Sequence, residues 1–397
     1  MKKLLIIAAA FALGVGCKNE GKSFIDENIN FAQAQYEVAL KAVDEYEKTN
    51  GEIKTPFTIG KDGNVKFVNE KAWVGGFFPG SMWYMYELTG DEKYAMEAQK
   101  LTEAIAGVQY ITDNHDVGFI CMCSFGNGMR LKGLDYKAII VQTAESLCTR
   151  WREAPSLIQS WEASEELDRK CPVIIDNMMN LELLFKATEL TGDDKYRQVA
   201  IRHADRTLKE HFRADASTWH VVDYDPETGA VRKKVTAQGY SDDSIWSRGQ
   251  AWAIYGYAMT YRFTGDKKYI EQAIATFNMM KNHTNMAEDC VPWWDMCAPN
   301  VPDECRDASS AAIIASALYE ISTMDVENPS QYKEYADKIM TSLASPAYRA
   351  QVGTNGGFLL MHSVGSIPHG GEVDKPLNYA DYYFLEALKR KRDIEAK

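Results

Sequence analysis

Positive charge is scarce in this chain of 397 residues, in which 44 Lys and Arg stand against 56 Asp and Glu and the formal net charge is −12. A chain with this balance is not expected to bind nucleic acid or an anionic membrane surface through its overall field. The sequence also has no phosphate loop, no dinucleotide fingerprint, no zinc-protease motif and no Gly-x-Ser-x-Gly. If the substrate is anionic, a local cation must therefore bind it against the global charge.

Apolar runs long enough to cross a bilayer are missing as well. Residues 1–17 combine Lys2 and Lys3 with a short apolar run and small residues before Cys17, which is typical of a bacterial lipoprotein signal. We predict that 1–17 is a signal peptide, that Cys17 is lipidated and that 18–28 is a tether. The protein would then be exported and face the periplasm, with membrane contact only through the lipid anchor. A plain signal peptide cleaved nearby is the alternative.

The cysteines do not follow a metal-binding pattern. Seven remain after Cys17, so at least one stays unpaired. Cys290, Cys297 and Cys305 lie near His283, but their spacings are irregular, and buried or disulfide-bonded thiols are favoured over a zinc site. Nothing in the sequence calls for a metal or a cofactor.

A helix–turn–helix pattern repeats along the chain, at 86–94, 188–196 and 262–269. In each repeat a Gly ends one amphipathic stretch and the following Asp caps the next. Recurring helical hairpins form either an open solenoid or a closed ring. Closure is favoured because no segment resembles an exposed cap and the stretches between hairpins are rich in Trp, Gly, His and Asp, as pocket loops are. We predict an all-α (α/α)6 barrel, six inner and six outer helices, in one domain covering residues 29–397.

Three further elements are expected outside the repeats. An opening helix should span about 29–47 and a closing helix 379–391. Strand signals are few, and the clearest are 219–224 and 231–237 on either side of a Pro-Gly turn.

The stretch 173–184 holds the strongest catalytic candidate. Its apolar residues suggest one amphipathic helix, in which Asp176 and Asn180 share a flank. A carboxyl group set among Ile and Met has a raised pKa and holds a proton near neutral pH, as a general acid requires. The alternative is that Asp176 caps a helix that starts after Pro172.

Asp116 is a second candidate acid on a separate loop. It follows His115 and precedes a Gly-Phe turn. Hydrolysis or hydration of a sugar bond commonly uses two carboxylates of this kind. Alone, Asp116 is unremarkable, because Asp is common in turns.

Arg248 lies between Trp246 and Trp252 in the densest inter-hairpin stretch. A guanidinium binds a carboxylate with two parallel hydrogen bonds and tolerates partial burial, so Arg248 is a candidate for binding a carboxylate on a sugar ring. An ion pair with Asp242 or Asp243 fits the spacing equally well.

Three motifs together resemble the unsaturated glucuronyl hydrolases of glycoside hydrolase family 88. They are Ile175 to Asn180, His115 to Phe119 and Ser244 to Trp252, and the likeness covers most of residues 30–391. The resemblance implies an (α/α)6 barrel that acts on a 4,5-unsaturated uronic acid at the non-reducing end of lyase-generated oligosaccharides.

The same resemblance implies a mechanism and a set of site residues. A carboxyl group protonates C4 of the vinyl ether, water adds to C5, and the resulting hemiketal opens to release the sugar. Asp176 would be the acid/base, and Asp116 would orient substrate or water and help keep Asp176 protonated. The positions that match the family's substrate pocket are Arg248, Trp246, Trp252, Gln238, His220, His115, Trp73 and Trp161.

One departure from the family concerns the late loop, residues 362–374. Family members that accept sulfated chondroitin units carry Ser-x-x-Ser-x-Lys there; Ser363 and Ser366 keep the spacing, but Pro368 stands at the Lys position. Binding of a 6-sulfate by that route is therefore not expected.

The predicted function is release of 4,5-unsaturated glucuronic acid from glycosaminoglycan-type oligosaccharides. The alternatives are an unsaturated rhamnogalacturonyl hydrolase on the same barrel and a glycan-binding lipoprotein without catalysis. A sugar epimerase would need a pair of catalytic His, and the seven His show no such pair.

Overall fold

The structure is a computed structural model that describes residues 23–397. The predicted signal peptide, Cys17 and the first part of the tether lie outside the described residues. Within 23–397, no helix is both long and apolar enough to span a membrane. All seven cysteines of this part are free thiols.

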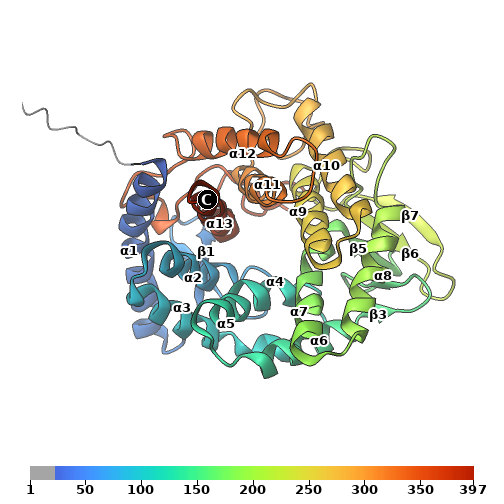
Figure 1. The fold of residues 1–397 in the computed structure, drawn as a ribbon, viewed down its shortest axis with the longest axis horizontal. Helices are drawn as coiled ribbons and strands as arrows, with labels where there is room; N and C mark the ends of the chain where they lie inside the picture. The colour runs from blue at the N-terminus through green and yellow to red at the C-terminus, as the bar shows by residue number, and fades with distance from the viewer. Residues whose placement is uncertain (1–22) are drawn as a thin grey trace, which may run out of the picture.

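The helices form two concentric rings (Figure 1). The outer ring consists of α1 (Phe24–Asn50), α3 (Glu92–Ala104), α6 (Lys137–Cys148), α8 (Lys195–Glu210), α10 (Lys267–Asn282) and α12 (Ser330–Leu343). The inner ring consists of α2 (Phe77–Thr89), α4 (Val117–Cys121) continued through η2 (Met122–Gly126) into α5 (Asn127–Lys132), α7 (Leu181–Thr191), α9 (Ser247–Thr264), α11 (Ala308–Ile321) and α13 (Asn378–Glu395). The ring closes because α13 packs against both α11 and α2. The predicted (α/α)6 barrel is confirmed.

Burial explains which helix belongs to which ring. Almost every residue of α11 is buried, as expected for a helix surrounded by neighbours. The outer helix α8 buries one stripe only and presents its charged face to solvent. Trp83 of α2 is fully buried and donates a hydrogen bond from Nε1 to Thr102 Oγ1 at 3.1 Å, so it packs in the core.

The repeated turns have the predicted geometry. Gly90, Gly192 and Gly265 end α2, α7 and α9 with φ of 70°, 74° and 70°, the left-handed conformation that favours glycine. Asp91 and Asp266 cap the helices that follow by accepting backbone N–H groups.

Short strands connect some of the helices. They are β1 (Thr55–Ile59) paired with β2 (Val65–Val68), β3 (Trp151–Arg152) paired with β4 (Leu157–Ile158), and the antiparallel sheet β5 (Cys171–Ile174), β6 (Val221–Tyr224) and β7 (Val231–Val235). The 3₁₀ segments are η1 (Ala106–Tyr110), η3 (Ile175–Asn180) and η4 (Asn355–Gly357). The strands predicted at 219–224 and 231–237 correspond to β6 and β7.

The prediction of one helix over 173–184 was wrong. Val173 and Ile174 pair with Val222 and Val221 in the sheet, the next six residues form η3, and α7 starts only at Leu181. β-Branched residues complete a sheet ladder well, and this long-range pairing outweighs the helical spacing of the apolar residues.

The predicted boundaries of the first and last helices also change. Helix α1 begins at Phe24, where the Ser23 side chain accepts the Asp26 backbone N–H at 3.1 Å. Residues 24–28 therefore belong to this helix and not to the tether. The closing helix, α13, extends the predicted 379–391 at both ends.

Candidate active site

The predicted site residues gather at the mouth of the barrel where the inner helices begin. Trp73 precedes α2, Asp116 directly precedes α4, Asp176 lies on η3 before α7, and Trp246 is the residue before α9. The loops that enter the inner ring therefore bring together residues that are far apart in the sequence.

The small sheet places Asp176 beside His220. Ile174 at the end of β5 pairs with Val221 at the start of β6, so the residue after β5 meets the residue before β6. The Ile175 backbone N–H donates to the His220 carbonyl at 3.1 Å. His220 Nε2 lies 3.9 Å from Asp176 Oδ2 as a result.

Asp176 and Asp116 form a pair of carboxyl groups, each of which gains or loses its proton near neutral pH. Burial, and then the charge of Asp116, raise the pKa of Asp176 from 3.8 to about 7. Burial raises the pKa of Asp116 to about 7 as well, against the lowering effect of its hydrogen bond from Asn180. The side chains stay 13% and 14% exposed, so both can be reached from outside. Near pH 7 the pair holds about one proton.

Asn180 orients Asp116, a role that the sequence analysis did not assign. Its Nδ2 donates to Asp116 Oδ1 at 3.2 Å, and its Oδ1 accepts the Phe119 backbone N–H at 2.9 Å. Gly118 allows this approach, because a Cβ there would come within 2.6 Å of Asn180 Oδ1. The sequence feature that pointed to Asn180 was its spacing from Asp176, which places both residues on one flank of the predicted helix.

The two site histidines are neutral. Two backbone N–H groups of 237–238 donate to His220 Nδ1 at 3.0 and 3.2 Å, so its proton is assigned to Nε2, facing Asp176. His115 Nε2 lies 3.5 Å from Asp116 Oδ2. Burial lowers the pKa of His115 to about 3 and that of His220 well below its usual range. Neither ring therefore competes with the carboxyl groups as an acid.

Arg248 is buried and bound by the late loop. It donates to Gln238 Oε1 at 2.7 Å and to the carbonyl groups of 364–365, and its Nη1 lies 3.4 Å from Asp307 Oδ2. Its guanidinium also lies over Trp246, 4.6 Å from the ring centroid. The side chain thus fixes the late loop at the mouth of the barrel and holds Gln238 in place.

An ion pair of Arg248 with Asp242 or Asp243, the other option from the sequence, is not formed. Asp307 is the carboxylate it meets, at the start of α11. This partner is 59 positions away along the chain, so local spacing carried no sign of it.

The predicted tryptophans divide into two kinds. Trp73 and Trp161 are half-buried, and Trp73 packs beside Tyr379 with centroids 4.9 Å apart. Trp246 and Trp252 are buried, with Trp246 against His220 at 4.5 Å. The half-buried pair can offer ring surface to a sugar, whereas the buried pair shapes the wall.

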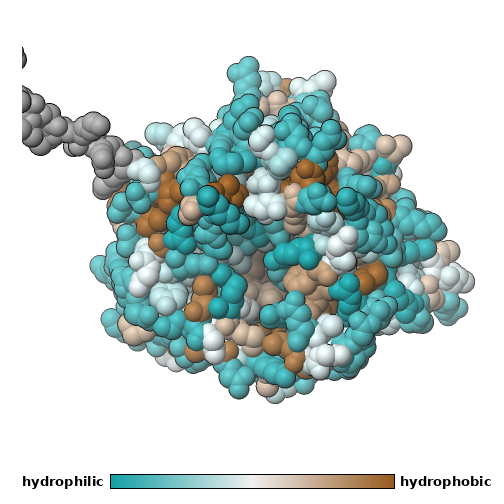
Figure 2. All heavy atoms as spheres, viewed as in Figure 1, coloured by the Kyte–Doolittle hydropathy of each residue, from teal (hydrophilic) through white to brown (hydrophobic). Residues whose placement is uncertain are grey.

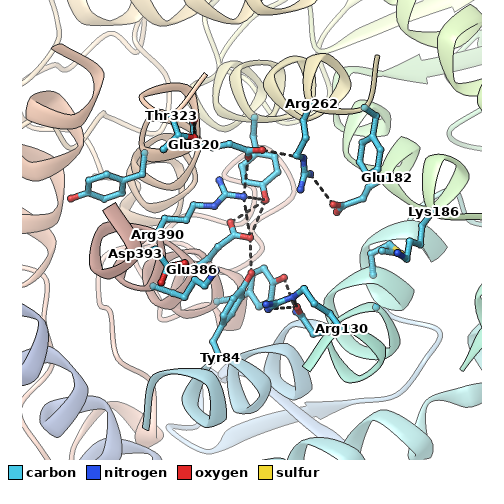
Figure 3. A pocket seen from close by; sticks show the side chains of 18 of the residues that line it. Tyr84, Arg130, Glu182, Lys186, Arg262, Glu320, Thr323, Glu386, Arg390 and Asp393 are labelled. Carbon is cyan, nitrogen blue, oxygen red and sulfur yellow. Dashed lines mark hydrogen bonds and ion pairs between the residues drawn. The ribbon is translucent and has the colours of Figure 1, made fainter. Parts of the chain in front are cut away.

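A cavity of about 740 Å³ lies at the opposite mouth, where the inner helices end. The hollow at the centre of Figure 2 opens on this face. The charged groups of this cavity are paired across the ring (Figure 3): Arg262 lies 2.8 Å from Glu182 and 3.0 Å from Glu320. Glu386 accepts hydrogen bonds from the hydroxyl groups of Tyr84 and Tyr255. None of the predicted site residues lines this cavity. Its paired charged groups connect the ends of the inner helices across the ring.

A closed ring of helical hairpins with two carboxyl groups of raised pKa at one mouth is the arrangement expected of an (α/α)6 glycoside hydrolase. The model of Glycosyl Hydrolase Family 88 matches residues 46–393, and the chain belongs to that family. An unsaturated glucuronyl hydrolase from Formosa agariphila is 41% identical over 398 residues, 99% of this chain and 98% of that protein. An unsaturated chondroitin disaccharide hydrolase from Streptococcus pyogenes is 33% identical over 85% of each.

Solved structures agree with this assignment. The crystal structure of an unsaturated glucuronyl hydrolase specific for heparin matches with a TM-score of 0.87 and 40% identity, covering 93% of this chain and 98% of that one. A mutant unsaturated glucuronyl hydrolase from Streptococcus agalactiae complexed with dGlcA-GalNAc6S matches with a TM-score of 0.75 and 30% identity, covering 92% and 91%. The resemblance seen in the sequence is confirmed, and the protein is a glycoside hydrolase.

Proposed function

We propose that this enzyme releases 4,5-unsaturated glucuronate from the non-reducing end of lyase-generated glycosaminoglycan oligosaccharides by hydrating the vinyl ether. The observation that carries the proposal is the pair of Asp176 and Asp116, both with pKa raised to about 7 and both partly exposed at one mouth of the barrel. The names of relatives that cover nearly the whole chain support the substrate class.

Protonation of carbon is the difficult step, and Asp176 supplies the proton. Its carboxyl group donates to C4, and the C4–C5 double bond becomes a C4–H bond. Positive charge then develops on C5 and the ring oxygen. Ionised Asp116 lies close enough to raise the pKa of Asp176, so the same negative charge stabilises the cation.

Water completes the reaction. It adds to C5 while the Asp176 carboxylate takes its proton, which forms a hemiketal and restores the acid. The hemiketal opens to a ketone at C5, and the hemiacetal left at C1 collapses to an aldehyde. The remaining oligosaccharide leaves as an alcohol, and every proton is accounted for.

The neutral histidines and the half-buried Trp73 position the sugar. The Nε2–H of His220 lies beyond hydrogen-bond distance of Asp176 and is free to donate to a sugar hydroxyl or to the attacking water. Trp73 offers a ring face. Arg248 holds Gln238 and the late loop in place, and the uronate carboxylate is expected near its guanidinium.

The test is turnover of a defined panel of disaccharides, followed by loss of the vinyl ether ultraviolet absorbance. We expect turnover of unsaturated glucuronyl disaccharides and none of their saturated counterparts, because only the former carry a C4–C5 double bond. Turnover restricted to unsaturated galacturonyl-rhamnose would make the protein a rhamnogalacturonyl hydrolase. Binding without turnover of any substrate would leave a glycan-binding protein.

We further propose that the protein is an exported lipoprotein anchored through Cys17, on the strength of the residue pattern of 1–17. Cys17→Ala should move the protein from the membrane fraction to the soluble fraction and abolish labelling by a radioactive fatty acid. Unchanged fractionation and labelling would contradict the anchor.

A further inference from the structure

Arg169 differs from every other arginine in residues 23–397. Each of the others donates at least one side-chain hydrogen bond. Arg169 is half-buried and, within this part of the chain, has no hydrogen bond and no ion pair from its guanidinium, which lies over the Trp161 ring at 5.4 Å from the centroid. In a chain of net charge −12, a cation left without a carboxylate is unexpected.

The two acidic groups whose charges act on Arg169, Asp223 and Asp242, already have other partners. Asp223 is bound by Arg232 and accepts two backbone N–H groups at 2.9 Å each. Asp242 accepts the Thr236 backbone N–H at 2.8 Å. A partly desolvated charge without a partner is unfavourable, so an anion from outside the chain would be bound here with a gain in free energy.

A short series of contacts joins Arg169 to the reacting carboxyl group. The Trp161 ring lies edge-on to His220 with centroids 5.8 Å apart, and His220 Nε2 lies 3.9 Å from Asp176. The charge of Arg169 is among the causes that lower the pKa of His220, as is that of Arg248. Arg169 is therefore connected to Asp176 through Trp161 and His220, and it lies on the Trp161 side of the site.

We propose that Arg169, stacked on Trp161, binds a sulfate group of the substrate. The inference rests on the proposed function. A planar guanidinium donates two parallel hydrogen bonds to an oxyanion, and stacking on Trp161 holds it ready to do so. In the late loop, Pro368 offers no cation for this purpose. The sulfate is carried either by the unsaturated uronate or by the sugar next to it.

The experiment compares Arg169→Gln with wild type on three unsaturated disaccharides: one without sulfate, one with sulfate on the uronate and one with sulfate on the second sugar. Loss of a hydrogen-bonded charge contact should lower kcat/KM for a sulfated disaccharide about ten- to a hundredfold and leave the unsulfated one within about twofold. The disaccharide that shows the loss identifies which sugar carries the sulfate. Added salt should reduce the wild-type advantage and have less effect on the variant.

Arg202→Gln is the matched control. Arg202 lies on the outer helix α8 and also stacks on a tryptophan, Trp151, at 4.7 Å from the ring centroid, but its guanidinium pairs with Glu153. It should leave all three values unchanged. Equal kcat/KM for Arg169→Gln and wild type on both sulfated substrates would overturn the proposal, as would an equal loss on all three. If wild type turned over none of them, the proposed function would fail, and calorimetric binding of the sulfated disaccharides to both proteins would still test Arg169.

Discussion

The raised pKa of Asp176 predicts that removing its charge stabilises the fold while it destroys catalysis. The unfolded carboxyl group titrates near 3.8, whereas the folded one titrates near 7. One pKa unit corresponds to about 1.4 kcal/mol, so a shift of about 3 units sets an upper value of about 4 kcal/mol. The neighbouring charge of Asp116 contributes to the shift and 13% of the side chain remains exposed, so we expect about 2–3 kcal/mol.

The sign of the pH dependence follows from which state binds the proton. Between about pH 4 and 7 the folded carboxyl group keeps its proton while the unfolded one has lost it, so wild-type stability falls as pH rises through this window. Asp176→Asn carries no titrating group. Its advantage over wild type should be absent near pH 4, grow with pH and level off above 7.

Thermal unfolding of both proteins at pH 5 and pH 8 measures this effect. Asp176→Asn should have the higher Tm at pH 8 and a smaller advantage at pH 5. Asp225→Asn is the control, because hydrogen bonds from Thr228 lower the pKa of Asp225 and its replacement should give no stabilisation at either pH. A Tm of Asp176→Asn below wild type at pH 8, or a difference independent of pH, would refute the reasoning.

Three further predictions follow from the same site. The pH profile of kcat/KM should be bell-shaped with its maximum near pH 7. Both pKa values are raised to about 7, so Asp176 loses its proton above that pH and Asp116 gains one below it. A flat profile from pH 5 to 9 would contradict this. The hydrogen bond from Asn180 lowers the pKa of Asp116, so Asn180→Ala should move the acid limb of this profile to higher pH. The same variant should have a free energy of unfolding lower by about 1–3 kcal/mol. An acid limb that stays in place would exclude the positioning role of Asn180. Arg248→Ala should raise KM, because the uronate carboxylate is expected near this guanidinium. It should also lower the free energy of unfolding by about 3–5 kcal/mol, because Asp307 is left buried without its cation. Unchanged Tm and KM would contradict the structural and the substrate-binding role of Arg248.

Much of the fold was predictable because its signals are local. The Gly-Asp turns at 90–91, 192–193 and 265–266 depend on backbone conformation and capping within a few residues. The helix predicted over 173–184 failed because strand pairing between β5 and β6 joins residues almost fifty positions apart. A run of apolar residues does not distinguish a strand from a buried helix.

The site shows the same division between local and long-range information. Asp176 stood out as a carboxyl group among Ile and Met residues, and its raised pKa follows from the burial that those apolar neighbours indicated. Asp116 was unremarkable alone, and its raised pKa comes from burial that its turn sequence did not indicate. The contacts of Arg248 with Asp307 and the late loop depend on how distant loops meet at the mouth, and so does the isolation of Arg169. No local sequence pattern indicates these long-range contacts.

The proposed mechanism requires the Asp176 carboxyl group to protonate the vinyl ether. The most direct test is the turnover of an unsaturated glucuronyl disaccharide by Asp176→Asn and wild type at equal concentration near pH 7, with Tm recorded on the same samples. Because Asp176 supplies the proton, we expect kcat of the variant to fall at least about a hundredfold, with Tm equal to or above wild type. Turnover within tenfold of wild type by a folded Asp176→Asn would contradict it.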